Sequence, residues 1–463
     1  MGGAEQKSKR QGSFERAEER RVASGNSMSG PRLGVFESAH EELFAPKAAG
    51  MAERRAVITG IGVIGPTGLG HVRLWDALRE RRVAIGPLRR FDAGLTPCRV
   101  AGEVDDEILA DRVDARKRRT TTRASQLALV AAELAMEDAR LPRGAIASEG
   151  LAVLVGTALG GWADGEQQAA ILLERGARRV NPFIAAGAPN HGPGAEVAAA
   201  VGGQGPQYTF STGCPSSLQA LAHGAALIES GVADGCLVGG TEAPLSPMTF
   251  AALSRTNELA TSQDPATASR PFDCAHAGMV LSEASAFLLL EPLDRARERG
   301  ATVYATVLGG AFSCDAQGMY GADASGAAAA SAIRRLLTTT ATRPDDLDYI
   351  CAHANSSPVF DRKEIAVLSA ALGEFLAGIP VSSIKGVLGH PFGASGALQA
   401  AASALAIRDS IIPPTANLES PAPECRARHV VGAPLSRTLR RVLITSYGYG
   451  GVNGYLLMGA PDS

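Results

Sequence analysis

Short apolar runs alternate with longer amphipathic stretches along most of the chain. Runs typical of buried strands lie at 56–60, 151–156, 236–239, 286–291, 303–309, 349–352, 380–382 and 441–445. Apolar residues at helical spacing (Leu127, Val130 and Leu134) predict a helix over 123–139, and further helices are expected at 218–230 and 293–299. Strands that alternate with helices predict an α/β fold whose sheets are covered on both faces.

The first 50 residues do not share this pattern. They are polar, mixed in charge and poor in large apolar residues, so they cannot offset the entropy lost on ordering. We therefore predict a disordered extension over 1–50. The lack of an apolar core segment excludes a secretory signal, and several Glu residues argue against a mitochondrial transit peptide. Met51, where the composition changes, is a candidate start of the functional protein.

Composition narrows the class of function. The 463 residues are 45% hydrophobic with a net charge of −2, which argues against a nucleic-acid partner because such binding needs a dense basic face. No apolar run is long enough to cross a bilayer, so no membrane partner is expected. The seven Cys residues are scattered without a CxxC, which argues against disulfides and structural zinc and favours the reducing cytoplasm.

One glycine motif suggests nucleotide binding, but its context does not. Gly60, Gly62 and Gly65 fit the G-x-G-x-x-G fingerprint after a strand. Pro66 follows at once, and no second strand ending in an acidic residue occurs about 20 residues later. We therefore expect a tight turn at the strand end. The histidines at 40, 71, 191, 223, 276 and 429 have no partners at ligand spacing, so no metal site is expected.

Chemistry is indicated most strongly at Cys214. This residue stands between an apparent strand and a helix, after Gly213 and before Pro215, which fits the first turn of a helix. A sulfur at a helix N-terminus is favoured as the thiolate, which lowers its pKa, and the sharp turn would expose it. A buried structural Cys is the alternative at this point.

Two histidines strengthen the catalytic interpretation. His353 follows a strand within the polar segment AHANSSP, and His390 lies between Gly389 and a Gly- and Ala-rich helix start. Either one alone would fit a structural role. Two histidines at strand-to-loop junctions, together with Cys214, resemble a site assembled at the ends of sheet strands.

From residue 54 to residue 458 the chain resembles the elongating β-ketoacyl-ACP synthases and the related ketosynthases of type II polyketide systems. The motifs that carry the resemblance occur in order: RRAVITGIGVIGPTG, STGCPSS, ASRPFD, GMVLSEASAFLLLEP, AHANSSPVFDRKE, VSSIKGVLGHPFGASGALQA, IPPTANL and SYGYGGVNGYLL. The resemblance implies a thiolase-like fold of two duplicated halves, expected at 51–302 and 303–463, in a five-layer αβαβα arrangement. It also implies a homodimer, or a heterodimer with a homologous chain-length-factor subunit.

The resemblance assigns roles to individual residues. Cys214 would carry the acyl chain as a thioester. His353 and His390 would stabilise the enolate of malonyl-ACP and assist its decarboxylation. Lys385 would organise the site electrostatically, with Glu364 supporting it from behind.

Departures from the family pattern indicate a specialised enzyme. Tyr449 takes the place of a gating Phe of the fatty-acid enzymes, and its backbone N–H, with that of Cys214, would hold the oxyanion. Asn355 and Ser357 fall where the family has Thr in HGTST, and both could bind the phosphopantetheine arm. The segment SEASA replaces a glycine-rich GDGAG and is closer to polyketide ketosynthases.

Substrates would arrive on the phosphopantetheine arm of an acyl carrier protein, without a further cofactor. Arg116, Arg119, Arg178 and Arg179 fall where the family docks this acidic protein. A solvated helix end would explain any single basic residue equally well.

Several alternatives fit the residues less well. A chain-length-factor-like partner subunit without activity lacks the Cys, and a thiolase needs a second reactive Cys in a motif that Cys425 does not match. An initiating, CoA-primed synthase has Asn where this chain has His390. A binding protein without chemistry leaves the matched residues unexplained. Housekeeping fatty-acid elongation is the second candidate pathway.

Overall fold

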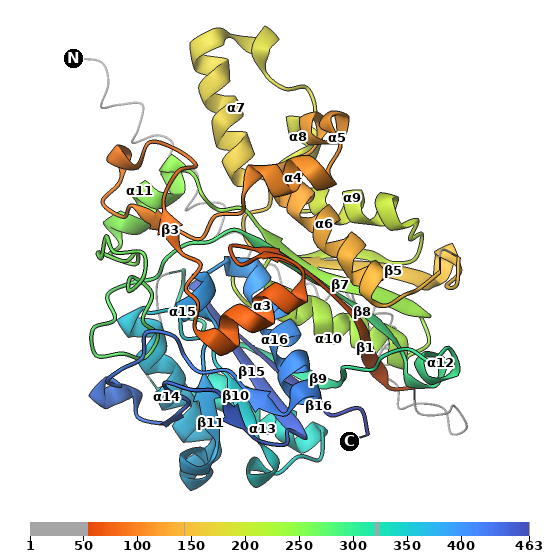
Figure 1. Cartoon of the computed structure of the whole chain (residues 1–463), viewed down its shortest axis with the longest axis vertical. Coiled ribbons are helices and arrows are strands. Elements are labelled where there is room, and N and C mark those ends of the chain that lie inside the picture. Colours follow the sequence, from red (N-terminus) through yellow and green to blue (C-terminus); the bar gives the residue numbers. More distant parts are fainter. Residues whose placement is uncertain (1–53, 143, 320–322, 324, 463) are drawn as a thin grey trace, which may run out of the picture. The chain divides into compact units, whose positions relative to one another are not determined.

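The structure is a computed structural model that describes residues 54–142, 144–319, 323 and 325–462. The predicted disordered extension at 1–50 lies outside the described residues. Within the described part, strands and helices alternate as the α/β pattern predicts (Figure 1).

Five strands of the first half pair in the order β6–β5–β7–β8–β1. They are β1 (Ala56–Gly65), β5 (Leu151–Gly156), β6 (Gln207–Phe210), β7 (Gly235–Glu242) and β8 (Ala284–Pro292). β5 is parallel to β6 and β7, whereas β8 is antiparallel to β7 and β1. Every residue of β1, β5, β7 and β8 is buried, which explains the short apolar runs that predicted these strands.

The second half repeats this topology in the order β11–β10–β15–β16–β9. Its strands are β9 (Ala305–Cys314), β10 (Tyr349–Cys351), β11 (Pro380–Ser382), β15 (Arg441–Gly448) and β16 (Val452–Gly459). β10 is parallel to β11 and β15, and β16 is antiparallel to β15 and β9, as in the first half. The two half-sheets join where β1 pairs with β9. The predicted duplication is therefore confirmed.

Helices separate the half-sheets and cover their outer faces. α6 (Arg123–Asp138) and α9 (Gly192–Val201) cover the first half-sheet, and α13 (Ala327–Thr339) and α14 (Pro358–Leu372) cover the second. α10 (Ser216–Glu229) and α16 (Ser395–Asp409) lie between them (Figure 1). This is the predicted five-layer αβαβα arrangement. In α16 every residue from Ser395 to Ile407 is buried, as a helix enclosed by two sheets requires.

The remaining elements lie at the ends and edges of these layers. They are β2 (Gly68–Leu69), α3 (His71–Glu80), β3 (Gly86–Pro87), β4 (Val100–Ala101), α4 (Asp106–Arg112), α5 (Ala115–Thr120), α7 (Trp162–Arg175), α8 (Ile184–Gly187), α11 (Pro247–Arg255), α12 (Leu293–Glu298), α15 (Lys385–Leu388), β12 (Ile411–Ile412), β13 (Arg428–His429) and β14 (Leu435–Ser436). None of the helices in the described ranges has the length and apolarity to span a bilayer.

A tight turn does end the strand, but it lies at Pro66 and Thr67, where β1 turns back into β2, and not at Gly60–Gly65, because β1 continues through Gly65. The glycines are needed for close packing of α6 on this strand. A Cβ at Gly60 would lie 2.2 Å from Ala135 O, and a Cβ at Gly62 would lie 1.9 Å from Ala131 O. The G-x-G spacing therefore marks a helix packed on a strand and not a phosphate loop.

Gly62→Ala should destabilise the protein by about 2–3 kcal/mol, because α6 must move away from β1 to admit the methyl group. Chemical denaturation of the purified variant measures this loss. Gly86→Ala is the matched control, since nothing lies within 4 Å of the Cβ it would add. Equal stability of the two variants would contradict the packing argument.

Candidate active site

A sharp turn between β6 and α10 presents Cys214. Gly213 has a positive φ of 71°, a conformation that glycine adopts without steric cost. Ser216 Oγ donates to Gly213 O at 2.5 Å and accepts the Thr212 N–H at 2.9 Å, which closes the turn. Pro215 is the N-cap of α10, so the predicted strand-to-helix junction is confirmed.

The sulfur of Cys214 is buried, not exposed as the turn had suggested. The residue is only 4% exposed because it packs in an apolar cluster with Met279 and Phe392, against Tyr449. Burial raises the pKa of the Cys214 thiol to about 12, although the positive charge of Lys385 acts in the opposite direction. The expected lowering of this pKa by the helix N-terminus is overridden by desolvation.

His390 contacts the thiol directly. Its Nε2 lies 3.2 Å from Cys214 Sγ, and its Nδ1 lies 3.1 Å from Ser395 Oγ. The backbone N–H of His390 donates to Val280 O at 2.7 Å, which ties this loop of the second half to a segment of the first. Burial, and then the charge of Lys385, lowers the pKa of His390 well below its ordinary value, so the ring is neutral.

His353 lies beside His390, directly after β10. The two rings are perpendicular, with centroids 5.2 Å apart. The ring is fully buried, and neither of its nitrogens has a hydrogen-bond partner in the described part of the chain. Burial, followed by Lys385 and His390, lowers the pKa of His353 well below its ordinary value. A neutral imidazole with unused polar atoms is available to a substrate.

Glu364 and Lys385 hold His353 from behind through its backbone. Glu364 Oε1 accepts the His353 N–H at 2.9 Å, and Oε2 accepts the Ala354 N–H at 2.8 Å. Lys385 Nζ donates to the carbonyl oxygen of His353. Because both side chains are fully buried, desolvation raises the pKa of Glu364 and lowers that of Lys385.

The backbone of Gly448 and Tyr449 lies against the Cys214 turn. A Cβ at Gly448 would be 3.0 Å from Pro215 Cδ and 3.1 Å from the backbone nitrogen of Cys214, so a side chain at this position would crowd the turn. The Tyr449 ring packs edge-on against Phe360, with centroids 5.8 Å apart.

Asn355 and Ser357 lie near the site, but protein atoms already engage them. Asn355 Oδ1 accepts the Ser357 N–H at 3.1 Å, and Ser357 Oγ donates to Glu258 Oε2 at 3.3 Å. Each residue is only 2% exposed. Their predicted contact with a phosphopantetheine arm stays a prediction.

Sequence reasoning missed Glu242 at the end of β7. Its carboxylate accepts the N–H groups of Ala158 at 2.7 Å, Leu159 at 2.9 Å and Gly393 at 2.9 Å. It thereby joins a loop of the first half to the loop that follows His390. Burial raises its pKa to about 7. The available signal was an acidic residue at the end of an otherwise apolar strand.

The predicted docking arginines gather on one surface. Arg116, Arg119 and Arg179 line the same surface pocket of about 560 Å³, and Arg178 is exposed next to Arg179. Asn181 Nδ2 donates to Arg119 O at 3.0 Å, which joins the two basic segments.

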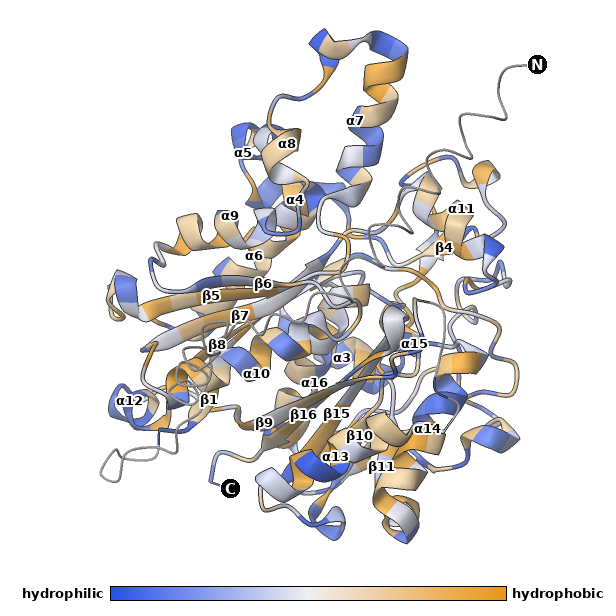
Figure 2. Ribbon diagram, turned by 180° about the vertical axis from the view of Figure 1, so that it is seen from behind, coloured by the Kyte–Doolittle hydropathy of each residue, from blue (hydrophilic) through white to orange (hydrophobic). Residues whose placement is uncertain are grey.

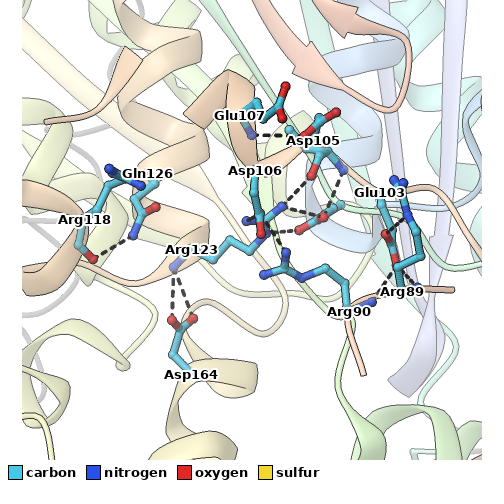
Figure 3. Close-up of polar contacts among 12 residues, drawn as sticks. Arg89, Arg90, Glu103, Asp105, Asp106, Glu107, Arg118, Arg123, Gln126 and Asp164 are labelled. Atoms are coloured by element: carbon cyan, nitrogen blue, oxygen red, sulfur yellow. Dashed lines mark hydrogen bonds and ion pairs between the residues drawn. The ribbon is translucent and has the colours of Figure 1, made fainter. Parts of the chain in front are cut away.

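This surface rests on a set of ion pairs around Arg123 (Figure 3). Its Nη1 contacts Asp106 Oδ1 at 2.6 Å, and its Nη2 donates to Glu283 Oε1 at 2.8 Å. Its backbone N–H donates to Asp164 Oδ2 at 3.2 Å. These contacts fix the start of α6 against α4 and α7, and the third partner, Glu283, is only 1% exposed.

Known families match both halves of the chain. The N-terminal domain of beta-ketoacyl synthase matches residues 53–296, and the C-terminal domain matches residues 304–419. The tetracenomycin polyketide synthase ketoacyl synthase alpha subunit of Streptomyces glaucescens is 40% identical over 424 residues, which cover 89% of this chain and 98% of that protein. The 3-oxoacyl-[acyl-carrier-protein] synthase 2 of a Synechocystis strain is 35% identical over 406 residues, with 88% and 98% coverage.

Solved structures agree with these relatives. A type II polyketide acyl-carrier protein in complex with its ketosynthase, bound to the hexaketide, matches with a TM-score of 0.80 and 28% identity, over 88% of this chain and 100% of that chain. The ishigamide ketosynthase/chain length factor matches with a TM-score of 0.82 and 30% identity, over the same shares. The chain therefore belongs to the β-ketoacyl synthase family of condensing enzymes.

Proposed function

We propose that this enzyme joins an acyl group carried on Cys214 to malonyl-ACP with loss of CO2. The observation that supports it best is the buried trio at the junction of the halves. The thiol touches one neutral imidazole at 3.2 Å, and a second imidazole with unused nitrogens stands 5.2 Å from the first. That arrangement suits a nucleophile with a base and a separate donor of hydrogen bonds.

In the first half-reaction, His390 Nε2 takes the thiol proton as Cys214 Sγ attacks the acyl thioester. The bond from the carbonyl carbon to the pantetheine sulfur breaks, and His390 returns the proton to that sulfur. The Ser395 hydroxyl next to Nδ1 can donate or accept, so it serves both tautomers of the ring. The backbone N–H groups of Cys214 and Tyr449 hold the oxyanion.

In the second half-reaction, malonyl-ACP loses CO2 and its electron pair forms an enolate. His353 and His390 donate hydrogen bonds to the enolate oxygen in a site that excludes water, where such bonds are strongest. The enolate carbon attacks the Cys214 thioester, the carbon–sulfur bond breaks, and the released thiolate takes up one proton. Lys385 keeps His353 in place throughout.

A specialised polyketide pathway fits best. Relatives include the ketoacyl synthase alpha subunit named for tetracenomycin, and one structural neighbour is a ketosynthase in complex with its type II polyketide acyl-carrier protein. The chain departs from the family pattern at Tyr449, Asn355 and Ser357, and these departures favour the same pathway. Housekeeping fatty-acid elongation is the second candidate, since a 3-oxoacyl-ACP synthase 2 is also similar. The intact Cys214 disfavours a subunit without activity.

A second subunit, either another copy or a homologous chain-length factor, is proposed to cover α7 and α8. Figure 2 shows α7 projecting from the body with hydrophobic residues along it. No residue of α7 is buried within the described chain. Trp162 and Leu172 of α7, and Phe183 at the start of α8, are each about half-exposed. A groove of about 740 Å³ runs between α7 and α8. Exposed apolar surface of this kind typically marks a subunit contact.

The acyl carrier protein is proposed to dock at Arg116, Arg119, Arg178 and Arg179. The convergence of the two basic segments on one pocket supports this assignment, because a single acidic protein can contact both. The substrates are bound to the carrier's own phosphopantetheine arm, so the enzyme needs no other cofactor. We place it in the cytoplasm.

Alkylation of Cys214 by iodoacetamide should accelerate about tenfold per pH unit between pH 7 and pH 9, because a thiol with a pKa of about 12 has a thiolate fraction that rises in that proportion. Peptide mass spectrometry separates Cys214 from the exposed Cys274, which reports the reagent's activity in the same sample. A rate that is constant over this range would mean that the thiolate is already formed.

Cys214→Ala should abolish acyl loading and lower condensation on the order of 1000-fold or more, while malonyl-ACP is still decarboxylated by the histidine pair. Intact-protein mass spectrometry with a panel of acyl-ACPs, with and without a candidate partner subunit, measures loading and product length. Loading of the Ala variant would refute Cys214 as nucleophile. Full activity of the enzyme on ordinary saturated acyl-ACPs, without a partner subunit, would favour housekeeping elongation.

Charge reversal at Arg178 and Arg179 (R178E/R179E) should weaken binding of the acyl carrier protein about tenfold at low salt and less at high salt, because screening removes the attraction. Surface plasmon resonance at two ionic strengths measures both values. Arg343→Glu, at an exposed position in the second half, is the control. Unchanged affinity in R178E/R179E would refute the docking role.

A further inference from the structure

We infer that Lys363 is a positioning residue that fixes the glycine loop, residues 448–451, relative to His353. The inference rests on the proposed function, since that loop carries the Tyr449 backbone assigned to the oxyanion. Lys363 lies on α14 directly before Glu364, and its side chain is only 9% exposed. Nothing in the proposed reaction uses its amine, so a buried cation this close to the site needs another explanation.

The amine of Lys363 completes a closed polar cluster under the loop. Its Nζ contacts Asp315 Oδ2 at 2.6 Å and donates to Asn453 Oδ1 at 3.0 Å. Asn453 Nδ2 donates in turn to Asp315 Oδ1 at 2.7 Å and to Gly451 O at 3.1 Å. The Asp315 side chain is fully buried, so its carboxylate depends on the lysine for charge balance.

The cluster holds the loop at its last residue. The backbone N–H of Asp315 donates to Gly451 O at 2.9 Å, so this carbonyl accepts two hydrogen bonds. A Cβ at Gly451 would lie 2.7 Å from Asp315 Cβ, which shows how closely the two segments approach. Three residues earlier the loop runs close to the nucleophile, because a Cβ added at Gly448 would lie 3.1 Å from the backbone nitrogen of Cys214. A shift at Gly451 would therefore be transmitted to the nucleophile.

A second contact connects Lys363 to His353. Its Nζ stands 5.4 Å from the centre of the Tyr447 ring, and that ring meets His353 edge-on with centroids 5.8 Å apart. The charge of Lys363 is also among the causes that lower the pKa of His353, after burial, Lys385 and His390. Two consecutive residues thus have separate tasks, because Glu364 holds the His353 backbone and Lys363 holds the loop.

Lys363→Gln should lower kcat for condensation about tenfold and change KM for either ACP substrate by less than twofold. The neutral amide cannot balance Asp315, so the loop is held less firmly, and small misplacements of reacting groups are costly in rate. Single-turnover loading of Cys214 and steady-state condensation measure the effects on kcat and on KM separately. Arg362→Gln is the matched control, since it removes the same charge from the preceding position of α14, which is exposed.

Two further variants distinguish positioning from a loss of folding. Lys363→Arg keeps the charge and should restore most of the rate. Lys363→Gln with Asp315→Asn removes both charges, should be no slower than Lys363→Gln alone, and is the variant to assay if the single one does not fold.

The inference is overturned if Lys363→Gln matches Arg362→Gln in rate, or if the Arg variant rescues folding but not kcat. It is equally overturned if the double variant is slower than Lys363→Gln alone. A wild-type enzyme that fails to load Cys214 would instead refute the proposed function, so the two failures are distinguishable.

Discussion

The close packing of the first turns of α10 and α16 is the constraint on which the site depends. A Cβ at Gly396 would lie 2.6 Å from Leu218 Cγ and 2.9 Å from the Leu218 backbone nitrogen, so the helices meet this closely only because glycine is present. The N–H of Ala397 donates to Ser217 Oγ at 2.9 Å across the same contact. Each helix starts just after a loop that carries a reactive group. The distance from thiol to imidazole is therefore set by helix packing, not by flexible loops.

Because these groups lie between the two half-sheets, the site is shielded from solvent, and this burial determines its electrostatics. Desolvation holds both imidazoles neutral and keeps the Cys214 thiol protonated, so the proton can move directly between sulfur and nitrogen. The same burial would be costly for Glu242 and Glu364 without partners. Each carboxylate instead accepts two or more backbone N–H groups from the loops that it orders.

Much of the architecture could be predicted because buried strands and amphipathic helices leave periodic signals. The helix expected at 123–139 is α6, and the run at 380–382 is β11. Identification of Cys214 and the two histidines required the combination of motifs along the whole chain. The sequence could not reveal that Gly60 and Gly62 serve helix packing, because the partner helix is some 70 residues away. Burial of Cys214 was likewise unpredictable, since the residues that cover it come from several distant segments. The contacts of Lys363 bring together α14, Asp315 and the segment from Tyr447 to Asn453, so no pattern in the sequence around Lys363 could predict them.

The duplication explains why the reactive groups divide as they do. Cys214 follows β6, and His390 follows the equivalent strand β11 of the other half, by way of the short helix α15. His353 follows β10, whose counterpart β5 leads into the loop held by Glu242. In both halves these loops leave the carboxyl ends of parallel strands, where such folds place their ligands. The first half therefore supplies Cys214, the proposed nucleophile, and the second supplies the two imidazoles. In the proposed reaction the thioester forms on a residue of one half and the enolate is held by residues of the other, so that reaction requires the two halves to be packed against each other.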